Sequence, residues 1–441
     1  MIEIKNETEK VILVGVSLSD QDDTKESLEE LKDLVSTAGA ETVGMVIQNR
    51  EQQHPGTYVG KGKIEELKSM IWELRATGIV CDDELSPAQM KNLQDELDVK
   101  VMDRTLIILD IFAARASTSE GKIQVELAQL KYRASRLAGL GKSLSRLGGG
   151  IGTRGPGEKK LEMDRRLIKS RIAQLNRELK DVKKHREVTR EQRSRSHIPV
   201  AAIVGYTNAG KSTLLNTLTG AGILAEDKLF ATLDPTTRDL KLPSGQEILM
   251  TDTVGFIRKL PHHLIEAFRS TLEEARYADI ILHVVDASNP QMDEQMHTVY
   301  ETLQNLGVKD KPVITVFNKI DRMEDIWVPR DLHADYYVKI SARTGEGITE
   351  FLQSVEAVLR EQKVEIEALY PYKEAGKIQL IRKYGELQEE EYREDAGNAF
   401  HAVCDAAIIH IRILRIAVKH DPLRIIDGFD LRLCLVQPVL R

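Results

Sequence analysis

The sequence has few cysteines and no long apolar run, and both absences narrow the class of protein. Its three cysteines, Cys81, Cys404 and Cys434, are odd in number and lack CxxC spacing, which argues against a disulfide framework and against a zinc site. No apolar stretch reaches the ~18 residues of a membrane-spanning helix. Residues 1–15 lack the charged-then-apolar order of a signal peptide. We therefore expect a cytoplasmic protein without a membrane span.

Charge is unevenly distributed along the 441 residues. The formal net charge is −7, but residues 114–195 contain 22 Lys and Arg against 9 Asp and Glu, a local charge of +13 that leaves −20 for the rest. A basic module in an acidic chain is expected of a protein with a polyanionic partner. Charge runs are also common on solvated helix faces, so the charge alone leaves both interpretations open.

Residues 1–112 are predicted to form a small α/β domain. Apolar β-type runs at residues 11–14, 43–47 and 79–81 alternate with helical patterns, and this alternation is typical of a largely parallel sheet. The sequence GKGK at residues 60–63 comes at the start of a predicted helix, where it would be able to hold a phosphate. A short GxG of this kind is more often a plain turn.

Residues 113–197 are predicted to form a basic antiparallel helical hairpin. Two apolar stripes, at residues 123–137 and 161–182, repeat at helical spacing. Between them lie residues 139–157, a tip with eight glycines and no acidic residue. A slender cationic tip suits a narrow RNA cavity, where bulky side chains would clash and phosphates need cations. A flexible linker is the competing interpretation. The tip residues expected to bind RNA are Lys142, Arg146 and Arg154.

Residues 198–363 are predicted to form a doubly wound P-loop domain. A buried-type strand at residues 198–204 opens it, and further apolar runs, each followed by a polar loop, recur at 248–250, 280–285, 313–317 and 337–340. Such folds bind ligands at the carboxyl ends of their strands. Residues 364–441 are weakly patterned and are predicted to form a small C-terminal α/β domain. The predicted fold class is therefore α/β with several domains, as the chain length also suggests.

A phosphate-binding motif follows the first strand of the P-loop domain. Residues 205–212 match GxxxxGK[ST] and precede a helical pattern. Glycines let successive N–H groups point into one concavity, and the helix N-terminus adds positive potential there. Lys211 would reach the β- and γ-phosphates, and the Ser212 hydroxyl would bind Mg²⁺. The residues expected to contact nucleotide here are Gly205, Tyr206, Thr207, Asn208, Ala209, Gly210, Lys211 and Ser212.

Three downstream motifs, each after a predicted strand, indicate that the nucleotide is GTP. Asp252 would hold the Mg²⁺ shell, and the Gly255 N–H would touch the γ-phosphate. The Asp321 carboxylate would accept hydrogen bonds from guanine N1–H and N2–H₂, a donor pair that adenine lacks. The loop 341–343 would lie behind the guanine O6. The residues expected to contact nucleotide in these motifs are Asp252, Thr253, Val254, Gly255, Asn318, Lys319, Ile320, Asp321, Ser341, Ala342 and Arg343.

The segment between the P-loop and Asp252 is expected to sense the γ-phosphate through a threonine on Mg²⁺. Three threonines qualify by their chemistry: Thr232, Thr236 and Thr237. After Gly255 the chain has Phe256, where Ras-like GTPases have a Gln that orients the attacking water. An apolar side chain cannot position water. Either another group does so or intrinsic hydrolysis is slow.

Three stretches resemble the sequences of HflX-type GTPases. They are GGGIGTRGPGEKKLEMDRR (residues 148–166), YVGKGKIEEL (58–67) and LFATLDPTTR (229–238). The resemblance covers about residues 10–400, whereas residues 404–441 do not match the family's usual ending. It implies a GTPase that binds the large ribosomal subunit and ribosomal RNA through the first domain and the hairpin. It also implies rescue of stalled ribosomes by splitting under stress, with hydrolysis stimulated by the ribosome.

The resemblance also implies roles for single residues. Thr232 matches the family's Mg²⁺-binding threonine, so Ser212 and Thr232 form the expected metal site, and Lys211, Thr232 and Gly255 are the expected catalytic residues. Related GTPases with an asparagine at the position of Asn208 use it to bind K⁺ beside the phosphates, which makes K⁺ a second expected cofactor. The stretch that matches the family's nucleotide-contacting segment is Phe230, Ala231, Thr232, Leu233 and Asp234.

The leading hypothesis is a monomeric, ribosome-associated GTPase whose GTP- and GDP-bound shapes control ribosome binding. The alternative is a nucleotide-gated RNA-binding factor for ribosome assembly, in which hydrolysis only resets the switch. A third class is an ATP-driven RNA remodeller. Asp321 argues against it for the P-loop domain, while residues 1–112 leave ATP binding open.

Overall fold

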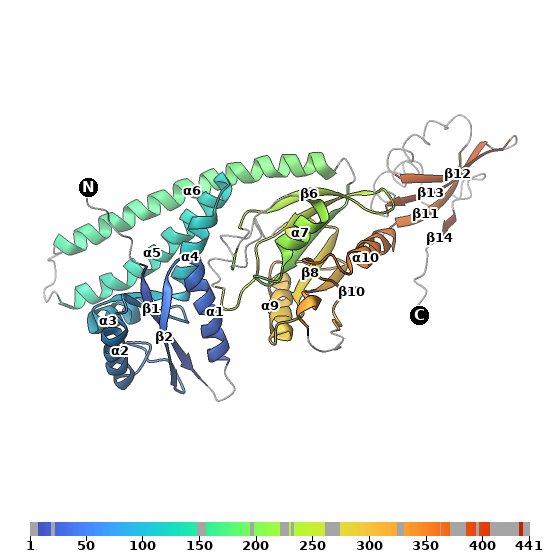
Figure 1. Ribbon diagram of the computed structural model, residues 1–441. Helices are drawn as coiled ribbons and strands as arrows, with labels where there is room; N and C mark the ends of the chain where they lie inside the picture. The colour runs from blue at the N-terminus through green and yellow to red at the C-terminus, as the bar shows by residue number, and fades with distance from the viewer. Residues whose placement is uncertain are drawn as a thin grey trace, which may run out of the picture. The chain divides into compact units, whose positions relative to one another are not determined.

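The computed structural model describes residues 8–18, 23–147, 156–194, 198–220, 229–230, 233–260, 274–323, 330–361, 363–370, 385–393, 397–405 and 432–434. The chain divides into two compact units, residues 1–240 with 247–348 and residues 241–246 with 349–441 (Figure 1). Within the described ranges, no helix is both long enough and apolar enough to cross a membrane.

The first unit begins with a parallel four-stranded sheet in the order β2-β1-β3-β4. Val11 and Leu13 of β1 join a cluster of buried residues with helices α1 and α4, whereas Ile12 and Val14 join another cluster with α2 and α3. Because side chains alternate along a strand, both faces of the sheet are buried. The strands are β1 (Lys10–Ser17), β2 (Glu41–Asn49), β3 (Gly78–Cys81) and β4 (Lys100–Asp103), and the helices are α1 (Thr24–Thr37), α2 (Lys61–Leu74), α3 (Pro87–Leu97) and α4 (Arg104–Arg115).

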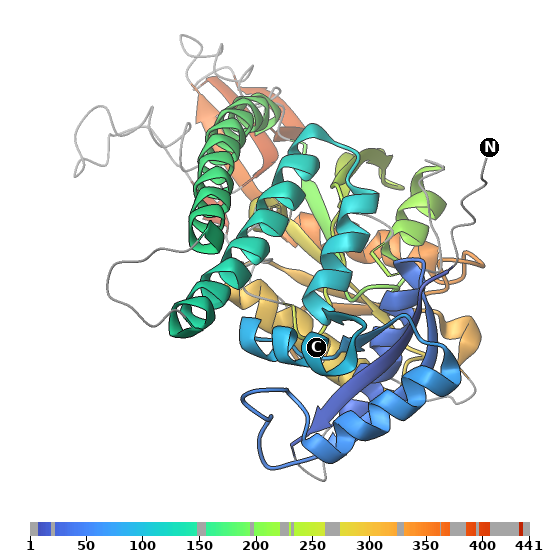
Figure 2. The same cartoon turned by 90° about the vertical axis from the view of Figure 1, so that its left-hand side faces the viewer.

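Helices α5 (Ser119–Leu147) and α6 (Pro156–Ser194) pack along each other (Figures 1 and 2). Arg171 of α6 pairs with Glu126 of α5 through two hydrogen bonds of 2.7 and 3.0 Å. Further along, Arg165 donates to the carbonyl of Leu137 at 2.8 Å. Residue numbers run in opposite directions through these contacts, so the pair is antiparallel.

Helix α5 is longer than the sequence predicts. It continues to Leu147, so Gly139 and Gly141 lie inside the helix and not in a tip between two helices. Each helical glycine costs about 1 kcal/mol relative to alanine, which is why the pattern favours a break here. Contacts with α6, such as that of Arg165 with Leu137, stabilise α5 on the N-terminal side of these glycines. Residues 148–155 fall outside the described ranges.

A six-stranded sheet forms the nucleotide domain, in the order β10-β9-β8-β5-β7-β6. Strand β5 pairs in parallel with β7 on one side and with β8 on the other, so the strand order reverses there. Ligands of open α/β sheets bind at such a point. The elements are β5 (Val200–Gly205), α7 (Lys211–Thr219), β6 (Thr236–Lys241), β7 (Glu247–Asp252), β8 (Ile280–Asp286), α9 (Met292–Asn305), β9 (Val313–Asn318) and β10 (Tyr336–Lys339).

The second unit contains most of α10 (Ile348–Glu361) and a sheet in the order β12-β13-β11-β14, whose paired strands are antiparallel. The described residues after α10 are all in strands, so they show the β part of the predicted small α/β domain and nothing of an α part. The strands are β11 (Lys363–Tyr370), β12 (Gly385–Arg393), β13 (Gly397–Asp405) and β14 (Arg432–Cys434).

Candidate functional site

Two glycines give the P-loop its shape at the carboxyl end of β5. Gly205 has φ +152°, and a Cβ there would lie 2.2 Å from the carbonyl oxygen of Val284. Gly210 has φ +96°, and its Cβ would lie 2.2 Å from Nδ2 of Asn318. Only glycine combines these backbone angles with such close approach. The loop therefore lies directly against β8 and against the motif at the end of β9.

Lys211 starts α7 with its side chain buried under the P-loop. Its Nζ donates to the carbonyl oxygens of Tyr206 at 2.7 Å and Gly205 at 3.2 Å. Burial lowers the pKa of Lys211 to about 8, although the nearby charge of Asp252 acts in the opposite direction. A phosphate beside this ammonium would stabilise its charged form. The side chain is thus held ready for an anion.

Ser212 and residues 252–255, the DTVG motif, meet at the same edge of the sheet. The Ser212 hydroxyl donates to Oδ2 of Asp252 at 2.7 Å, and Thr253 donates to the carbonyl of Ile203 at 2.7 Å. A Cβ on Gly255 would lie 3.0 Å from the Lys211 Nζ and 2.8 Å from Cγ2 of Thr207. Glycine therefore leaves free the space directly above the lysine, where a phosphate would have to fit. Hydroxyl and carboxylate oxygens are ligands that Mg²⁺ prefers.

The remaining P-loop residues hold the loop to its neighbours. The Thr207 N–H donates to the carbonyl of Phe256 at 2.8 Å, and the Phe256 N–H donates to Gly205 at 3.1 Å, so this loop and the DTVG segment are paired. The Thr207 hydroxyl is buried without a hydrogen-bond partner. Asn208 is exposed and has φ +61°, a left-handed conformation that asparagine tolerates well. Ala209 is buried.

The predicted guanine-binding motifs lie together at the ends of β9 and β10. Asn318 joins two loops, since its Nδ2 donates to the carbonyl of Ala209 at 2.9 Å and its Oδ1 accepts from the Ala342 N–H at 2.9 Å. The Ser341 hydroxyl donates to Oδ1 of Asp321 at 2.7 Å. These contacts orient the Asp321 carboxylate. Lys319 is paired with Asp286 at 2.7 Å, Ile320 lies in a short 3₁₀ turn and Arg343 is exposed.

The segment after α7 is described only in part, and Ala231 and Thr232 lie outside the described residues. Phe230 packs edge-on against Phe112 of α4, with ring centroids 4.7 Å apart. Leu233 joins the same cluster, and Asp234 accepts hydrogen bonds at the start of α5. The side chains of Phe230, Leu233 and Asp234 thus face α4 and the start of α5. The nucleotide contacts predicted for residues 230–234 remain a prediction, and in the described residues among them only backbone atoms are left to make them.

The other two threonine candidates lie in a strand that the sequence analysis did not predict. Thr236 and Thr237 are in β6, and the Thr237 hydroxyl is 3.0 Å from the hydroxyl of Thr251 in β7. Their places are therefore set by the sheet. Thr232, the third candidate, lies outside the described residues.

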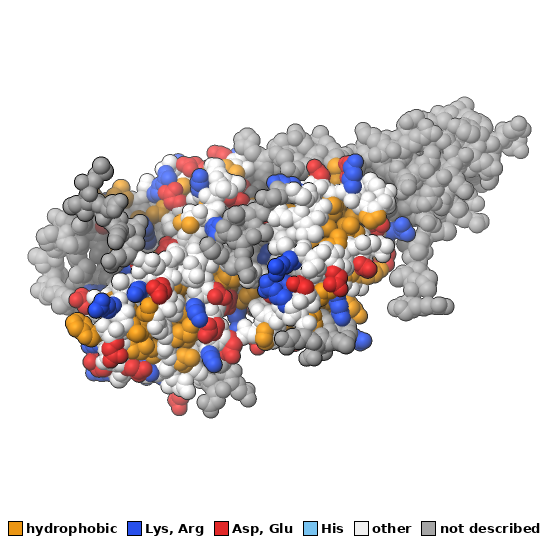
Figure 3. Space-filling view, in the orientation of Figure 1, with side chains coloured by type: hydrophobic (Ala, Val, Ile, Leu, Met, Phe, Trp, Pro, Cys, Tyr) orange, Lys and Arg blue, Asp and Glu red, His pale blue; other side chains and the backbone are white. Residues whose placement is uncertain are grey.

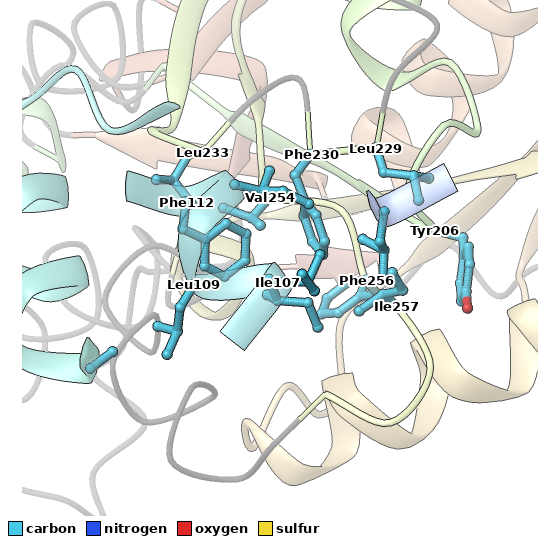
Figure 4. Close-up of a cluster of buried hydrophobic side chains, with 14 of the residues drawn as sticks. Ile107, Leu109, Phe112, Tyr206, Leu229, Phe230, Leu233, Val254, Phe256 and Ile257 are labelled. Carbon is cyan, nitrogen blue, oxygen red and sulfur yellow. The ribbon is translucent and has the colours of Figure 1, made fainter. Parts of the chain in front are cut away.

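Phe256 occupies the position of the water-orienting glutamine, but its side chain is buried in an apolar cluster and cannot position water. It is 2% exposed and lies in a cluster with α4 residues, P-loop Tyr206 and the segment at Phe230 (Figure 4). Helix α4 contributes Ile107, Leu109 and Phe112 to this cluster. Both segments expected to respond to the γ-phosphate thus rest on one helix of the first domain.

A buried ionic network beside this cluster was missed by the sequence analysis. The Arg104 side chain, 2% exposed, donates to Oδ1 of Asp82 at 3.0 and 3.2 Å and to the carbonyl of Ser27 at 2.8 Å. Lys259, three residues after Phe256, is ion-paired with Asp82. Burial raises the pKa of Asp82, but the charges of Arg104 and Lys259 outweigh it and lower the pKa.

The network continues to the P-loop through Tyr206. The Tyr206 hydroxyl donates to Oε1 of Glu30 at 2.9 Å and accepts from the Arg258 N–H at 2.8 Å. Arg258 is also ion-paired with Asp23 and with Glu294. A tyrosine inside the P-loop and a basic pair after DTVGF are the sequence signals that point to such an interface. Their partners in the first domain, Asp23, Glu30 and Asp82, lie more than a hundred residues earlier and leave no local pattern.

The predicted RNA-binding residues are not described at the level of their side chains. Lys142 and Arg146 belong to α5, but their side chains fall outside the described part, and Arg154 lies wholly outside it. The described part of α6 has exposed cations at Arg166, Lys169, Arg177, Lys180 and Lys184.

Three family models match successive parts of the chain. The family model described as "50S ribosome-binding GTPase" matches residues 200–319, that of "GTP-binding GTPase N-terminal" matches residues 25–113, and that of "GTP-binding GTPase Middle Region" matches residues 115–193. A solved GTP-binding protein from the archaeon Sulfolobus solfataricus, in complex with GDP, is 26% identical with a TM-score of 0.43, over 79% of this chain and 98% of that one.

Curated relatives are similar over most of their length. GTPase HflX of Lacrimispora saccharolytica is 71% identical over 395 residues, covering 90% of this chain and 93% of the relative. GTPase HflX of Escherichia coli K12 is 42% identical over 396 residues, covering 88% and 92%. With the P-loop, the DTVG motif, NKID (residues 318–321) and SAR (residues 341–343) gathered at one sheet edge, these matches show that the chain is a GTP-binding and GTP-hydrolysing protein of the HflX family.

Proposed function

We propose that this GTPase binds the large ribosomal subunit through its basic hairpin, that its nucleotide state controls this binding, and that it splits stalled ribosomes. The observation that carries the proposal is the hairpin itself, a long antiparallel helix pair with a strong excess of cations. The hairpin follows the domain whose helix α4 packs against the nucleotide-sensing segments around Phe230 and Phe256. The description of the matching family model, a 50S ribosome-binding GTPase, agrees with it.

Charge distribution supports the hairpin as the polyanion-binding element. On the described residues of the face shown in Figure 3, basic and acidic side chains are interspersed. A mixed surface attracts a polyanion weakly, whereas clustered cations release counterions from phosphates and bind strongly at low salt. The exposed cations of α6 and the excess of +13 in residues 114–195 provide such a cluster.

At the nucleotide, Asp321 would select guanine, and Ser212 with Thr232 would hold Mg²⁺, which GTPase domains generally use. Bound Mg²⁺ would neutralise charge on the β- and γ-phosphates. Lys211 would bind oxygens of the β- and γ-phosphates, and the Gly255 N–H would donate a hydrogen bond to the γ-phosphate. Since Phe256 is buried against α4, water positioning must come from elsewhere. K⁺ held at Asn208 is one group that would help to position the water. Equal GTP turnover in K⁺ and Na⁺ buffers would rule out this role for K⁺.

Co-sedimentation of the full chain with ribosomes tests the proposal. On sucrose gradients we expect binding to the large subunit and loss of 70S particles with a GTP analogue, and release with GDP. Selective binding to precursor particles would instead support a role in ribosome assembly, and no binding to any particle would refute both.

Charge-removal variants test the hairpin. Arg146→Ala with Arg154→Ala should weaken binding and lower the slope of log K against log salt by about 1.4–1.8, because each phosphate contact contributes roughly 0.7–0.9. The matched control removes two cations of the nucleotide domain, Lys309→Ala with Lys311→Ala. Identical salt slopes in the two variants would contradict the hairpin as the binding element.

A further inference from the structure

Helix α5 starts with a cap that its own sequence leaves incomplete. Thr118 precedes the helix, and its Oγ1 accepts from the Gly121 N–H at 2.9 Å. In a capping box the residue at position 121 would be Glu or Gln, whose side chain accepts from the N–H of the capping residue. Gly121 has no side chain to do so. The N–H groups of Ser117 and Thr118 therefore need an acceptor from another part of the chain.

Asp234, from the segment after α7, is that acceptor. Its Oδ2 accepts from the Ser117 N–H and the Thr118 N–H, each at 2.9 Å, and from the Ser117 hydroxyl at 2.7 Å. Its Oδ1 accepts from the Thr118 hydroxyl at 2.6 Å. These four hydrogen bonds engage both oxygens of the carboxylate. A charged acceptor at a helix N-terminus is favourable.

Gly121 provides the space that Asp234 occupies. A Cβ at position 121 would lie 2.3 Å from Oδ1 of Asp234 and 3.1 Å from Oγ1 of Thr118. Any side chain there would push the carboxylate out. The glycine and the incoming aspartate are thus two independent signs of one contact.

The backbone around Asp234 is conformationally restricted, between Leu233 and the start of β6. Pro235 follows it and fixes its own φ, which also restricts Asp234 to extended conformations. Leu233 on the other side is buried in the cluster with Phe112. A displacement of this segment would therefore move the carboxylate as a unit with its neighbours.

We propose that Asp234 is a positioning residue that couples the segment 229–234 to the base of the hairpin, so that the cap of α5 is complete in only one of the two nucleotide states. The part of this inference that concerns ribosomes rests on the proposed function. The contact itself is a property of the free protein and is testable without ribosomes.

Three changes break the contact from different sides. Asp234→Ala removes the acceptor, and Ser117→Ala with Thr118→Val removes the hydroxyl donors. Gly121→Ala displaces the carboxylate while leaving the helix stable, because alanine has the higher helix propensity. Asp239→Ala, an exposed acid of β6, is the matched control.

The first measurement is hydrogen exchange of the amides of residues 117–122 in the full chain, with GDP and with a GTP analogue. We expect exchange in the unmodified protein and in Asp239→Ala to differ at least fivefold between the two nucleotides, the lower end of couplings between sites. In Asp234→Ala and Gly121→Ala it should be fast with both. Equal exchange in the unmodified protein, or a preserved difference in Gly121→Ala, overturns the proposal.

The second measurement is the dissociation constant for GDP. The three changes break the same contact, so by thermodynamic linkage they should alter this constant by a similar factor, whereas Asp239→Ala should leave it unchanged. If Asp234→Ala weakens GDP binding tenfold or more while Gly121→Ala does not, the carboxylate is a nucleotide ligand and the proposal is wrong. On ribosomes, the ratio of affinities with the two nucleotides should fall toward one in Gly121→Ala. If the unmodified protein binds no ribosomal particle, the proposed function fails, and the exchange result still decides the role of Asp234.

Discussion

Replacing Arg104 by methionine should destabilise the first unit far more than replacing Lys259, although both pair with Asp82. The Arg104 side chain is 2% exposed and that of Asp82 is 1% exposed, whereas Lys259 is 39% exposed. Removing one partner of a buried pair costs about 3–5 kcal/mol because the other charge is left in a medium of low polarity. For a pair open to water the cost is about 0–1 kcal/mol.

The structure places Arg104→Met at the lower end of that range. Asp82 keeps Lys259 and the Ser27 hydroxyl at 2.8 Å as partners, so its charge is not wholly uncompensated. We expect a loss of about 3 kcal/mol for Arg104→Met and about 1 kcal/mol or less for Lys259→Met. The difference of about 2 kcal/mol is large enough to measure by unfolding in urea.

The assay follows the far-UV circular dichroism of the full chain against urea. The double variant Arg104→Met with Asp82→Asn is the control, and it should cost less than the sum of its parts because neither charge is left alone. Equal losses for Arg104→Met and Lys259→Met, or a loss below about 1 kcal/mol for Arg104→Met, would refute the argument from burial.

Three further predictions concern the nucleotide domain and its contact with α4. Asp321→Asn should weaken GTP binding about 100-fold, since hydrogen bonds to a charged group contribute about 1.5–3 kcal/mol; titration with fluorescent GTP measures this, and unchanged affinity would contradict the guanine assignment. His283 is buried, and burial lowers its pKa to about 4; the unfolded chain therefore binds the extra proton first, and stability should fall by about 3 kcal/mol as the pH drops from about 6.5 to 4. His283→Phe should flatten this pH profile in urea unfolding, and an unaltered profile would exclude the residue as the cause. Phe112→Ala should cost about 3–5 kcal/mol and alter GTP turnover, because it removes the ring under Phe230; Phe112→Leu should cost less, and turnover unaffected by either change would argue against α4 as support for the segment.

Local patterns were enough to predict the parallel sheets and the sheet edge at which the nucleotide motifs meet. The P-loop geometry depends on Gly205 and Gly210, whose spacing can be recognised in the sequence without knowledge of the fold. Strand β6 was missed because its residues, TTRDLK, contain a single large apolar side chain. Pairing in the sheet overrides that weak propensity.

Contacts between distant segments could not be predicted. The sequence shows that Phe256 is not a glutamine, but its packing against α4 depends on residues more than a hundred positions earlier. The resemblance to a family likewise implied that the segment of Asp234 contacts nucleotide. The structure shows the carboxylate on α5, a contact that requires both the glycine at 121 and the three-dimensional arrangement of the two segments.

The shared cluster between α4 and the nucleotide domain has a consequence during synthesis. Phe112 leaves the translating ribosome before Phe230, Phe256 and Ile257 have been made. At roughly 5–20 residues per second, the wait for Ile257 is on the order of 7–30 s. During that time the first domain can form its sheet while the side of α4 that will contact Phe230 and Phe256 faces water. A nascent chain of this protein therefore has a defined period of aggregation risk, which ends when the residues after the DTVG motif emerge.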